Sequence, residues 1–415
     1  MLEWLMRTGS SPSAQIALFT AAGQTASFAS IPLLLTIYPP DQFGSYAAFL
    51  ASAVVLASVA TLRFEAAIPL PSNPGIWRGL ASCSLLSVGF FAASAWLVIR
   101  YALDAADRSV ILTPALVAIM AANQVLTVIA TRQERYRAIA RRGLTQSVGV
   151  ILAQLLLGSF WAPTTNSLLI GHITGQTLTL VTLSLALERP TTSWRLGDLR
   201  RSATRYWAYP ATLVPSTLLN NLSLHSPVLL SSLYFGPEAT GVIAIAIRVV
   251  STPVSLISQS VATVYVARFS SALRSGDFTA GYQLFLRTTR KLILIALPGA
   301  TVIALAAPAA ADSALPGAWA NAGPLISILA LSATAQFIVS PTSQTLLLMG
   351  YPANQLTYDA ARLIAVALSI TAGAAFTDDL PVAIASFSGI SALTYSVLWY
   401  MGHKKLRHAA YAPPV

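Results

Sequence analysis

Apolar runs of about twenty residues recur along the whole chain, and this feature constrains the fold more than any other. An α-helix rises about 1.5 Å per residue, so a run of that length crosses the roughly 30 Å hydrocarbon core of a lipid bilayer. Charged residues make up only 9% of the sequence, against roughly 25% in an ordinary soluble domain. The sequence therefore predicts an all-α polytopic membrane protein.

Twelve of these runs, bounded by charged residues, proline or glycine, are predicted to be transmembrane helices. The first six lie near Ala14–Ile37, Ser45–Leu62, Leu80–Ile99, Val110–Ala130, Thr145–Trp161 and Leu168–Leu187. The second six lie near Ala211–Phe235, Thr240–Val266, Leu292–Ala311, Pro324–Met349, Ala353–Phe376 and Pro381–Met401. The predicted organisation is an N-terminal segment (1–13), an N-lobe (14–190), an inter-lobe loop (191–208), a C-lobe (209–401) and a tail (402–415).

Lys and Arg residues gather on one side of the predicted spans. All but four of the 25 fall in the termini or in connections on the same side as the termini; the exceptions are Arg100, Arg108, Arg248 and Arg362. Cytoplasmic loops are enriched in Lys and Arg, so both termini are predicted to be cytoplasmic. The basic loops would also suit a polyanion, but their alternation with acidic loops favours the topological explanation. The net charge of +11 is therefore no reason to expect a nucleic-acid partner.

Two turns indicate an internal repeat. Residues 38–44 read YPPDQFG and residues 234–241 read YFGPEATG, so each has a proline, an acid, two residues and a glycine. Each turn follows the first helix of a six-helix set on the outer side. Parallel six-helix halves are a known transporter plan, with the substrate site where the halves meet. The sequence thus predicts two parallel-repeat six-helix lobes around a central cavity.

Several stretches resemble the polysaccharide transporter, or Wzx-type O-unit flippase, branch of the multidrug/oligosaccharidyl-lipid/polysaccharide (MOP) superfamily. They are residues 38–46, TLRFE at 61–65, IPLP at 68–71, FGPEATG at 235–241, AIRVV at 246–250, PVSLI at 253–257 and VARFS at 266–270. The resemblance implies a MATE-like fold in which the first, second, seventh and eighth spans line the cavity. It also implies a flippase for undecaprenyl-diphosphate-linked oligosaccharides in the bacterial inner membrane, with polysaccharide polymerase or assembly proteins as candidate partners.

Arg248 is the candidate for binding the substrate diphosphate. It lies seven residues after Gly241, hence about 10 Å inside the predicted eighth span at about 1.5 Å per residue. An arginine at the centre of a span costs about 2.5–3.5 kcal/mol on insertion scales, which favours a functional reason for its presence. Its guanidinium group matches the geometry of phosphate oxygens. The alternative is a structural arginine that snorkels to the membrane interface or pairs with a neighbouring carbonyl group.

A polar stripe marks the predicted seventh span. Thr217, Asn221 and His225 follow one another at four-residue steps and share one helical face, with Asn220 beside them. We expect this stripe to line the cavity, with interhelical hydrogen bonding as the alternative. Gln24 in the first span has the same two interpretations.

Two charged pairs lie on other spans. Arg63 and Glu65, at the end of the second span, are candidates for a cytoplasmic mouth that meets the phosphate or for interfacial anchors. Asp359 and Arg362, three residues apart on the eleventh span, are interpreted as a structural ion pair, with ion coupling as the alternative.

The sequence contains no metal-ligand spacing, P-loop or nucleotide-binding motif, so we expect no metal or cofactor and predict a transporter that is not an enzyme. Three other functions stay open. A drug or metabolite exporter of the same superfamily would need acids in its cavity. A glycan polymerase or acyltransferase would need catalytic groups on a large outer loop or a buried cluster of His and Arg near the outer face, whereas the outer loops here are short. A scaffold for glycan assembly would tolerate replacement of Arg248.

Overall fold

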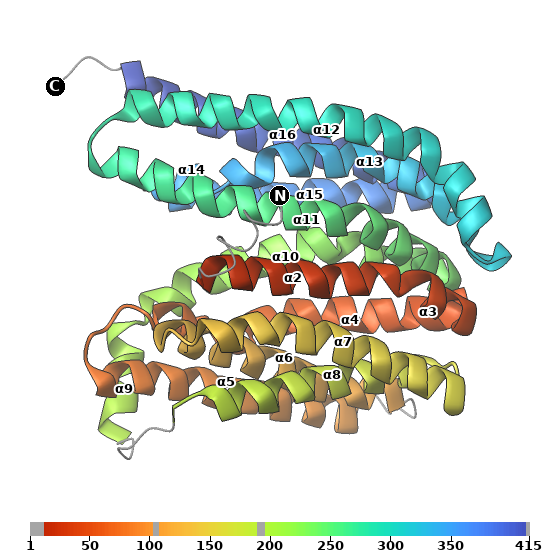
Figure 1. Ribbon diagram of the computed structural model, residues 1–415, viewed down its shortest axis with the longest axis horizontal. Helices are drawn as coiled ribbons and strands as arrows, with labels where there is room; N and C mark the ends of the chain where they lie inside the picture. The colour runs from red at the N-terminus through yellow and green to blue at the C-terminus, as the bar shows by residue number, and fades with distance from the viewer. Residues whose placement is uncertain (1–11, 103–107, 189–195, 412–415) are drawn as a thin grey trace, which may run out of the picture. The chain divides into compact units, whose positions relative to one another are not determined.

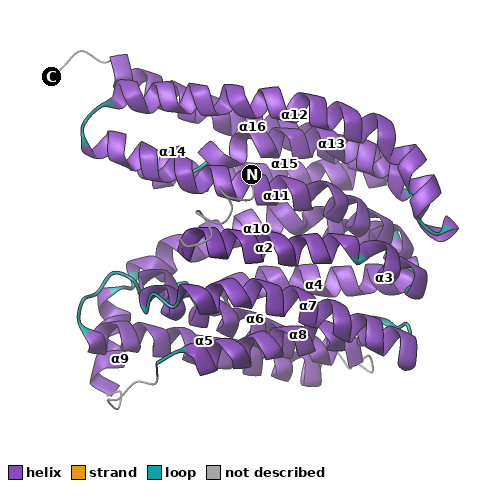
Figure 2. Ribbon diagram, viewed as in Figure 1, coloured by secondary structure: helices purple, strands orange, loops and turns teal. Residues whose placement is uncertain are grey.

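The computed structural model describes residues 12–102, 108–188 and 196–411, and Figures 1 and 2 show that these residues are almost entirely helical. The elements up to residue 205 are α2 (Pro12–Ala29), α3 (Ile31–Ile37), α4 (Pro40–Ala60), η1 (Phe64–Ala67), α5 (Pro74–Ala102), α6 (Arg108–Arg132), α7 (Tyr136–Phe160), α8 (Thr165–Ala186) and α9 (Leu196–Arg205). The later elements are α10 (Ala208–Tyr234), α11 (Gly236–Arg274), α12 (Phe278–Ala314), η2 (Gly317–Trp319), α13 (Ala322–Val339), η3 (Ser340–Thr342), α14 (Thr345–Leu348), α15 (Pro352–Thr377) and α16 (Leu380–Tyr411).

The predicted all-α membrane architecture is confirmed. Within the described residues, eleven segments are long and apolar enough to cross a membrane, where twelve spans were predicted. The difference is α10, which occupies the position of the predicted seventh span and has 27 residues but does not belong to the eleven. The side chains of the predicted polar stripe lie on this helix and lower its hydropathy.

Several boundaries differ from the prediction. The first span is two helices, because α3 begins at Ile31 with Pro32 in its first turn, and proline donates no backbone hydrogen bond. The tenth span is divided into α13, η3 and α14. Helix α9 was not expected and lies within the predicted inter-lobe loop. Residues 1–11 of the predicted N-terminal segment, 191–195 of that loop and 412–415 of the tail lie outside the described residues.

Contacts divide the chain into two compact units, of which the first ends at His225 and the second begins at Ser226. Four pairs of helices recur in the two six-helix sets when α2–α3 and α10 are counted as the first helix of each set. The second helix packs on the fourth (α4–α6 and α11–α13), and the third packs on the fourth (α5–α6 and α12–α13). The sixth packs on the fourth (α6–α8 and α13–α16) and on the fifth (α7–α8 and α15–α16). This shared pattern is the structural counterpart of the internal repeat.

Close helix packing in the first unit depends on glycine. A Cβ atom at Gly175 of α8 would lie 2.4 Å from the backbone nitrogen of Val150 on α7, and one at Gly171 would lie 2.8 Å from that of Gln154. The two glycines are spaced as G-x-x-x-G, the arrangement that lets transmembrane helices approach closely. Helices α7 and α8 are therefore held at a separation that no larger residue permits.

The first outer turn is anchored on α7 by Tyr38. Its hydroxyl donates a hydrogen bond of 2.7 Å to the backbone oxygen of Gln154, and only 1% of the residue is exposed. Burial raises the pKa of Tyr38 to about 12, so the hydroxyl stays protonated and remains a donor.

Candidate functional site

Arg248 lies deep within α11. This helix begins at Gly236, whose φ of +80° suits glycine, and Pro237 follows in the first turn. Arg248 is twelve residues further on, hence about 18 Å from the start of the helix at about 1.5 Å per residue. The expected depth was about 10 Å at the same rise per residue, because the span was predicted to begin later. The side chain is half-buried.

A proline follows Arg248 within the same helix. Pro253 lies inside α11 and has no backbone N–H, so the carbonyl of Val249 lacks its usual helical donor. One turn of α11 therefore combines a permanent cation with an extra backbone acceptor. The hydroxyl of Thr252 donates to the backbone oxygen of Arg248 at 2.7 Å.

The predicted polar stripe lies on α10. Thr217, Asn220, Asn221 and His225 are all half-buried, and the Asn221 amide donates a hydrogen bond of 2.9 Å to the backbone oxygen of Thr217. Gln24 lies on α2 and is half-buried as well. The structure thus brings Thr217 and Asn221 together, whereas the lining of one cavity by all six predicted residues stays a prediction.

Arg63 and Glu65 form a buried ion pair where α4 ends. Leu62 and Arg63 adopt positive φ values of 50° and 58°, which turn the chain into η1. An Arg63 guanidinium nitrogen lies 3.1 Å from Oε1 of Glu65, and the Glu65 side chain is only 2% exposed. The Gln124 amide on α6 donates to the same oxygen at 3.0 Å. The pair therefore joins the α4–α5 connection to α6.

Asp359 and Arg362 are both buried on α15, with exposed fractions of 3% and 6%. The amide of Gln355 donates to Oδ1 of Asp359 at 3.2 Å. The Arg362 guanidinium donates to the hydroxyl of Tyr395 on α16 at 2.8 Å. The Arg362 bond joins α15 to α16 within the second unit, next to an apolar cluster of Val339, Leu346, Tyr358, Tyr395 and Leu398.

A buried polar network in the first unit was not predicted. The Tyr46 hydroxyl on α4 lies 2.8 Å from Nδ1 of His172 on α8, and Nε2 of His172 lies 3.3 Å from the Gln176 amide. The Asn123 amide on α6 donates to Oε1 of Gln176 at 3.0 Å. The signal in the sequence is the presence of single amides within apolar runs, but nothing in the sequence shows which of them meet.

Metal-ligating side chains do not cluster in the part of the chain that the structure describes: no group of three or more His, Cys, Asp or Glu residues there could hold a metal ion. The polar atoms of the candidate site belong to one arginine, amides, hydroxyls and a histidine. This set can bind anions and sugar hydroxyls reversibly.

Residues 76–324 match the polysaccharide biosynthesis protein family. The chain belongs to this family. A curated relative, the teichuronic acid biosynthesis protein TuaB of Bacillus subtilis, is 24% identical over 178 residues, or 41% of this chain. The match spans 35% of the length of TuaB.

The fold of this polysaccharide biosynthesis protein is that of the MOP superfamily. A multidrug resistance MATE transporter in an inward-facing conformation matches with a TM-score of 0.76 and 13% identity, over 96% of this chain and 100% of that structure. The lipid II flippase MurJ matches with a TM-score of 0.67 and 11% identity, over 95% and 89% of the two chains. A MOP superfamily transporter from Pyrococcus furiosus matches with a TM-score of 0.63 and 12% identity, over 96% of this chain and 97% of that structure.

These findings confirm the resemblance to the polysaccharide transporter branch that the sequence motifs indicated. The polysaccharide biosynthesis protein is a multi-pass membrane protein with the fold of the MATE and MurJ structures.

Proposed function

We propose that the protein is a flippase that moves undecaprenyl-diphosphate-linked oligosaccharide units across the bacterial inner membrane, for the synthesis of O-antigen, capsule or exopolysaccharide. The observation that carries this proposal is Arg248, a half-buried arginine about 18 Å along an apolar helix of a polysaccharide biosynthesis protein. Such an arginine costs about 2.5–3.5 kcal/mol on insertion scales. Binding of a diphosphate substrate would explain why an arginine is present at this depth, because the guanidinium binds phosphate oxygens through paired hydrogen bonds.

The main barrier to flipping is the polar headgroup. Each hydroxyl moved without a partner into an alkane-like medium costs roughly 4–8 kcal/mol. A hydrated path lined by Arg248, the α10 stripe and Gln24 lowers this cost by supplying hydrogen bonds while the lipid tail stays in the bilayer. The two lobes then expose the path to each side of the membrane in turn, and no covalent step is required.

Both termini are proposed to be cytoplasmic, since the basic connections share their side. Substrate then enters from the cytoplasmic leaflet, and polysaccharide polymerase or assembly proteins receive it on the outer side. Asp359 is the candidate for ion coupling, and the nearby positive charge of Arg362 would compete with a bound cation. Arg63 and Glu65 are the candidates for the cytoplasmic mouth of the path. The burial of Glu65 favours a structural role for the pair, which joins the α4–α5 connection to α6.

The test is transport by the purified protein in liposomes. A fluorescent undecaprenyl-diphosphate oligosaccharide is placed in the membrane, and its appearance in the opposite leaflet is measured by reaction with a membrane-impermeant reagent. A lipid with the same glycan on an uncharged linkage is the matched control. We expect the diphosphate lipid to move and the uncharged lipid to move much more slowly. Equal movement of both lipids, or transport of a cationic drug instead, contradicts the proposal.

A further inference from the structure

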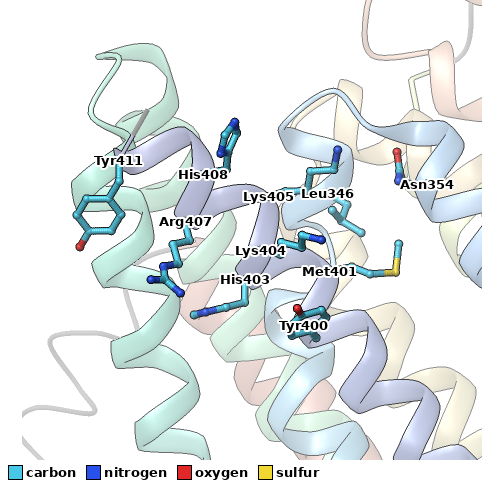
Figure 3. Close-up of a pocket in the computed structure, with 10 residues that line it drawn as sticks. All are labelled: Leu346, Asn354, Tyr400, Met401, His403, Lys404, Lys405, Arg407, His408 and Tyr411. Atoms are coloured by element: carbon cyan, nitrogen blue, oxygen red, sulfur yellow. The ribbon is translucent and has the colours of Figure 1, made fainter. Parts of the chain in front are cut away.

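A basic pocket lies at one end of the second unit. It has a volume of about 740 Å³ and is lined by residues that include His403, Lys404, Lys405, Arg407 and His408, all from the last turns of α16. Figure 3 shows these side chains together with Leu346 of α14 and Asn354 of α15. Among the lining residues there is no acid. The pocket is therefore electrostatically suited to an anion.

Aromatic contacts hold the pocket wall in place. The rings of Trp399 and His403 stack with centroids 4.9 Å apart, and Tyr282 of α12 lies 5.5 Å from His403. The Trp399 indole also donates to the hydroxyl of Thr289 on α12 at 3.1 Å. Trp and Tyr are enriched at the headgroup depth of membranes. The end of α16 thus has the composition of an interface, with lysines beside an aromatic belt.

The first unit has a second basic pocket, of about 700 Å³. Its charged lining residues are Arg135, Arg137, Arg141 and Arg142, with Glu134 as the one acid in the lining. Two threonines, Thr145 and Thr182, add hydroxyls to the lining. Nε of Arg142 is buried and has no hydrogen-bond partner among the described residues. Arginines and hydroxyls together are the groups that proteins use to bind phosphate.

The two pockets occupy the same place in the internal repeat. In the first unit the lining comes from the α6–α7 connection, the start of α7 and the end of α8. In the second unit it comes from α14, the start of α15 and the end of α16. In both, these are the end of the fourth span, the start of the fifth and the end of the sixth.

The charges, however, come from different helices. Most of the arginines in the first pocket are on the fifth span, whereas the basic residues of the second are on the sixth. The rule for membrane topology requires positive charge on this side of the membrane but no pocket. A basic pocket recurs at the same place in both units although different residues supply the charge, which indicates that the two pockets bind the same kind of ligand.

We propose that each pocket binds the phosphate-bearing headgroup of an anionic membrane lipid. Positive clusters at the ends of transmembrane helices attract anionic lipids, and basic pockets between helices bind their headgroups. A zwitterionic headgroup fits less well, because its cationic part would meet Lys and Arg side chains. This inference does not depend on which substrate the protein transports.

The first experiment is native mass spectrometry of the purified protein titrated with phosphatidylglycerol or phosphatidylcholine. We expect wild-type protein to retain two phosphatidylglycerol molecules and to bind phosphatidylcholine at least about tenfold more weakly, because the headgroup has no net charge. Two variants are compared with the wild type. One replaces Lys404, Lys405 and Arg407 of the second-unit pocket by glutamine, and the other replaces Arg137, Arg141 and Arg142 of the first-unit pocket by glutamine. Each is expected to lose one retained lipid.

A matched control removes the same charge outside the pockets. Arg200, Arg201 and Arg205 are exposed on α9, and their replacement by glutamine should leave both lipids bound. Loss of lipid in this control, no loss in either pocket variant, or equal retention of phosphatidylcholine would each overturn the proposal. Glycerol phosphate is added as a competitor to test whether the pockets bind a soluble phosphate instead. If it displaces the lipid at equal concentration, the pockets bind soluble phosphate rather than a lipid.

A second measurement uses the unaltered protein. The sequence contains three lysines, Lys291, Lys404 and Lys405, and all three are exposed. Phosphatidylglycerol is expected to slow acylation of Lys404 and Lys405 by a water-soluble reagent several-fold relative to Lys291, whereas phosphatidylcholine should not. Uniform labelling of the three lysines in both lipids contradicts a site at α16.

Discussion

Replacement of Arg63 by glutamine is expected to destabilise the first unit strongly. The change removes the guanidinium that lies 3.1 Å from Oε1 of Glu65, a side chain only 2% exposed. Breaking a buried pair by removing one partner costs about 3–5 kcal/mol, because a charge is left without compensation. Since the Arg63 side chain is 24% exposed, we expect the lower end, about 3 kcal/mol.

A second ion pair in the same unit is the control. Arg135 and Glu188 also form a salt bridge, but their side chains are 44% and 69% exposed. Exposed pairs contribute about 0–1 kcal/mol, so Arg135→Gln should change stability little. The double change of Arg63 and Glu65 to glutamine should be milder than Arg63→Gln alone, because no buried charge is left and Gln124 keeps an acceptor.

The assay is thermal unfolding in detergent, followed by fluorescence-detected size exclusion. At about 2–4 °C per kcal/mol for a unit of 150–250 residues, Arg63→Gln should lower the melting temperature by roughly 6–12 °C. Arg135→Gln should lower it by at most about 4 °C on the same scale. Equal shifts for the two variants would refute the reasoning. Normal stability with lost transport would assign Arg63 to a mouth that meets the substrate instead.

Four further changes test the packing and the buried hydrogen bonds. Gly175→Val should destabilise the α7–α8 contact by about 1–3 kcal/mol through overpacking, whereas Gly389→Ala, with nothing within 4 Å of the new Cβ atom, should not lower the melting temperature. Arg362→Met removes the 2.8 Å bond to Tyr395 and a cation near buried Asp359, so its melting temperature should fall further than that of Gly175→Val. Tyr38→Phe should cost about 0.5–1.5 kcal/mol, measured by the same unfolding assay, because one buried hydrogen bond is lost. Wild-type unfolding of Gly175→Val, Arg362→Met or Tyr38→Phe would contradict the corresponding contact.

The sequence predicted the helices well because hydropathy depends on local composition alone. The prediction of helix boundaries failed at prolines, because a proline that begins a new helix and one that lies inside a continuous helix look alike in the local sequence. Pro32 begins a new helix, whereas Pro253, Pro298 and Pro308 lie inside continuous helices. Neighbouring helices and side chains satisfy the freed carbonyl groups in membranes, so a proline by itself does not predict a break.

Helix α9 shows a second limit. Its sequence is rich in arginine and was interpreted as loop, but Leu199 and Ala203 pack on the apolar cluster around Ile76 and Leu80. The hydroxyl of Ser202 also donates to the backbone oxygen of Ile76 at 2.9 Å. These partners are more than a hundred residues away in sequence, so the reason for the helix is tertiary.

Some residues of the candidate site could be predicted from the sequence, whereas the polar contacts between helices could not. Arg248 and the α10 stripe could be predicted because polar side chains are costly within a span and therefore conspicuous. The contacts of Tyr46 with His172 and of Asn123 with Gln176 join different helices. No spacing along the chain predicts them.

Diphosphate binding by Arg248 is tested by comparing Arg248→Gln with Arg268→Gln in the liposome assay. Both arginines lie on α11, but Arg268 is exposed near the end of the helix, so its loss controls for charge. At matched insertion, Arg248→Gln is expected to slow flipping of the diphosphate lipid by at least about tenfold, corresponding to about 1.4 kcal/mol of lost interaction. Arg268→Gln should transport normally. Wild-type rates for Arg248→Gln would contradict an arginine that binds the diphosphate within the membrane.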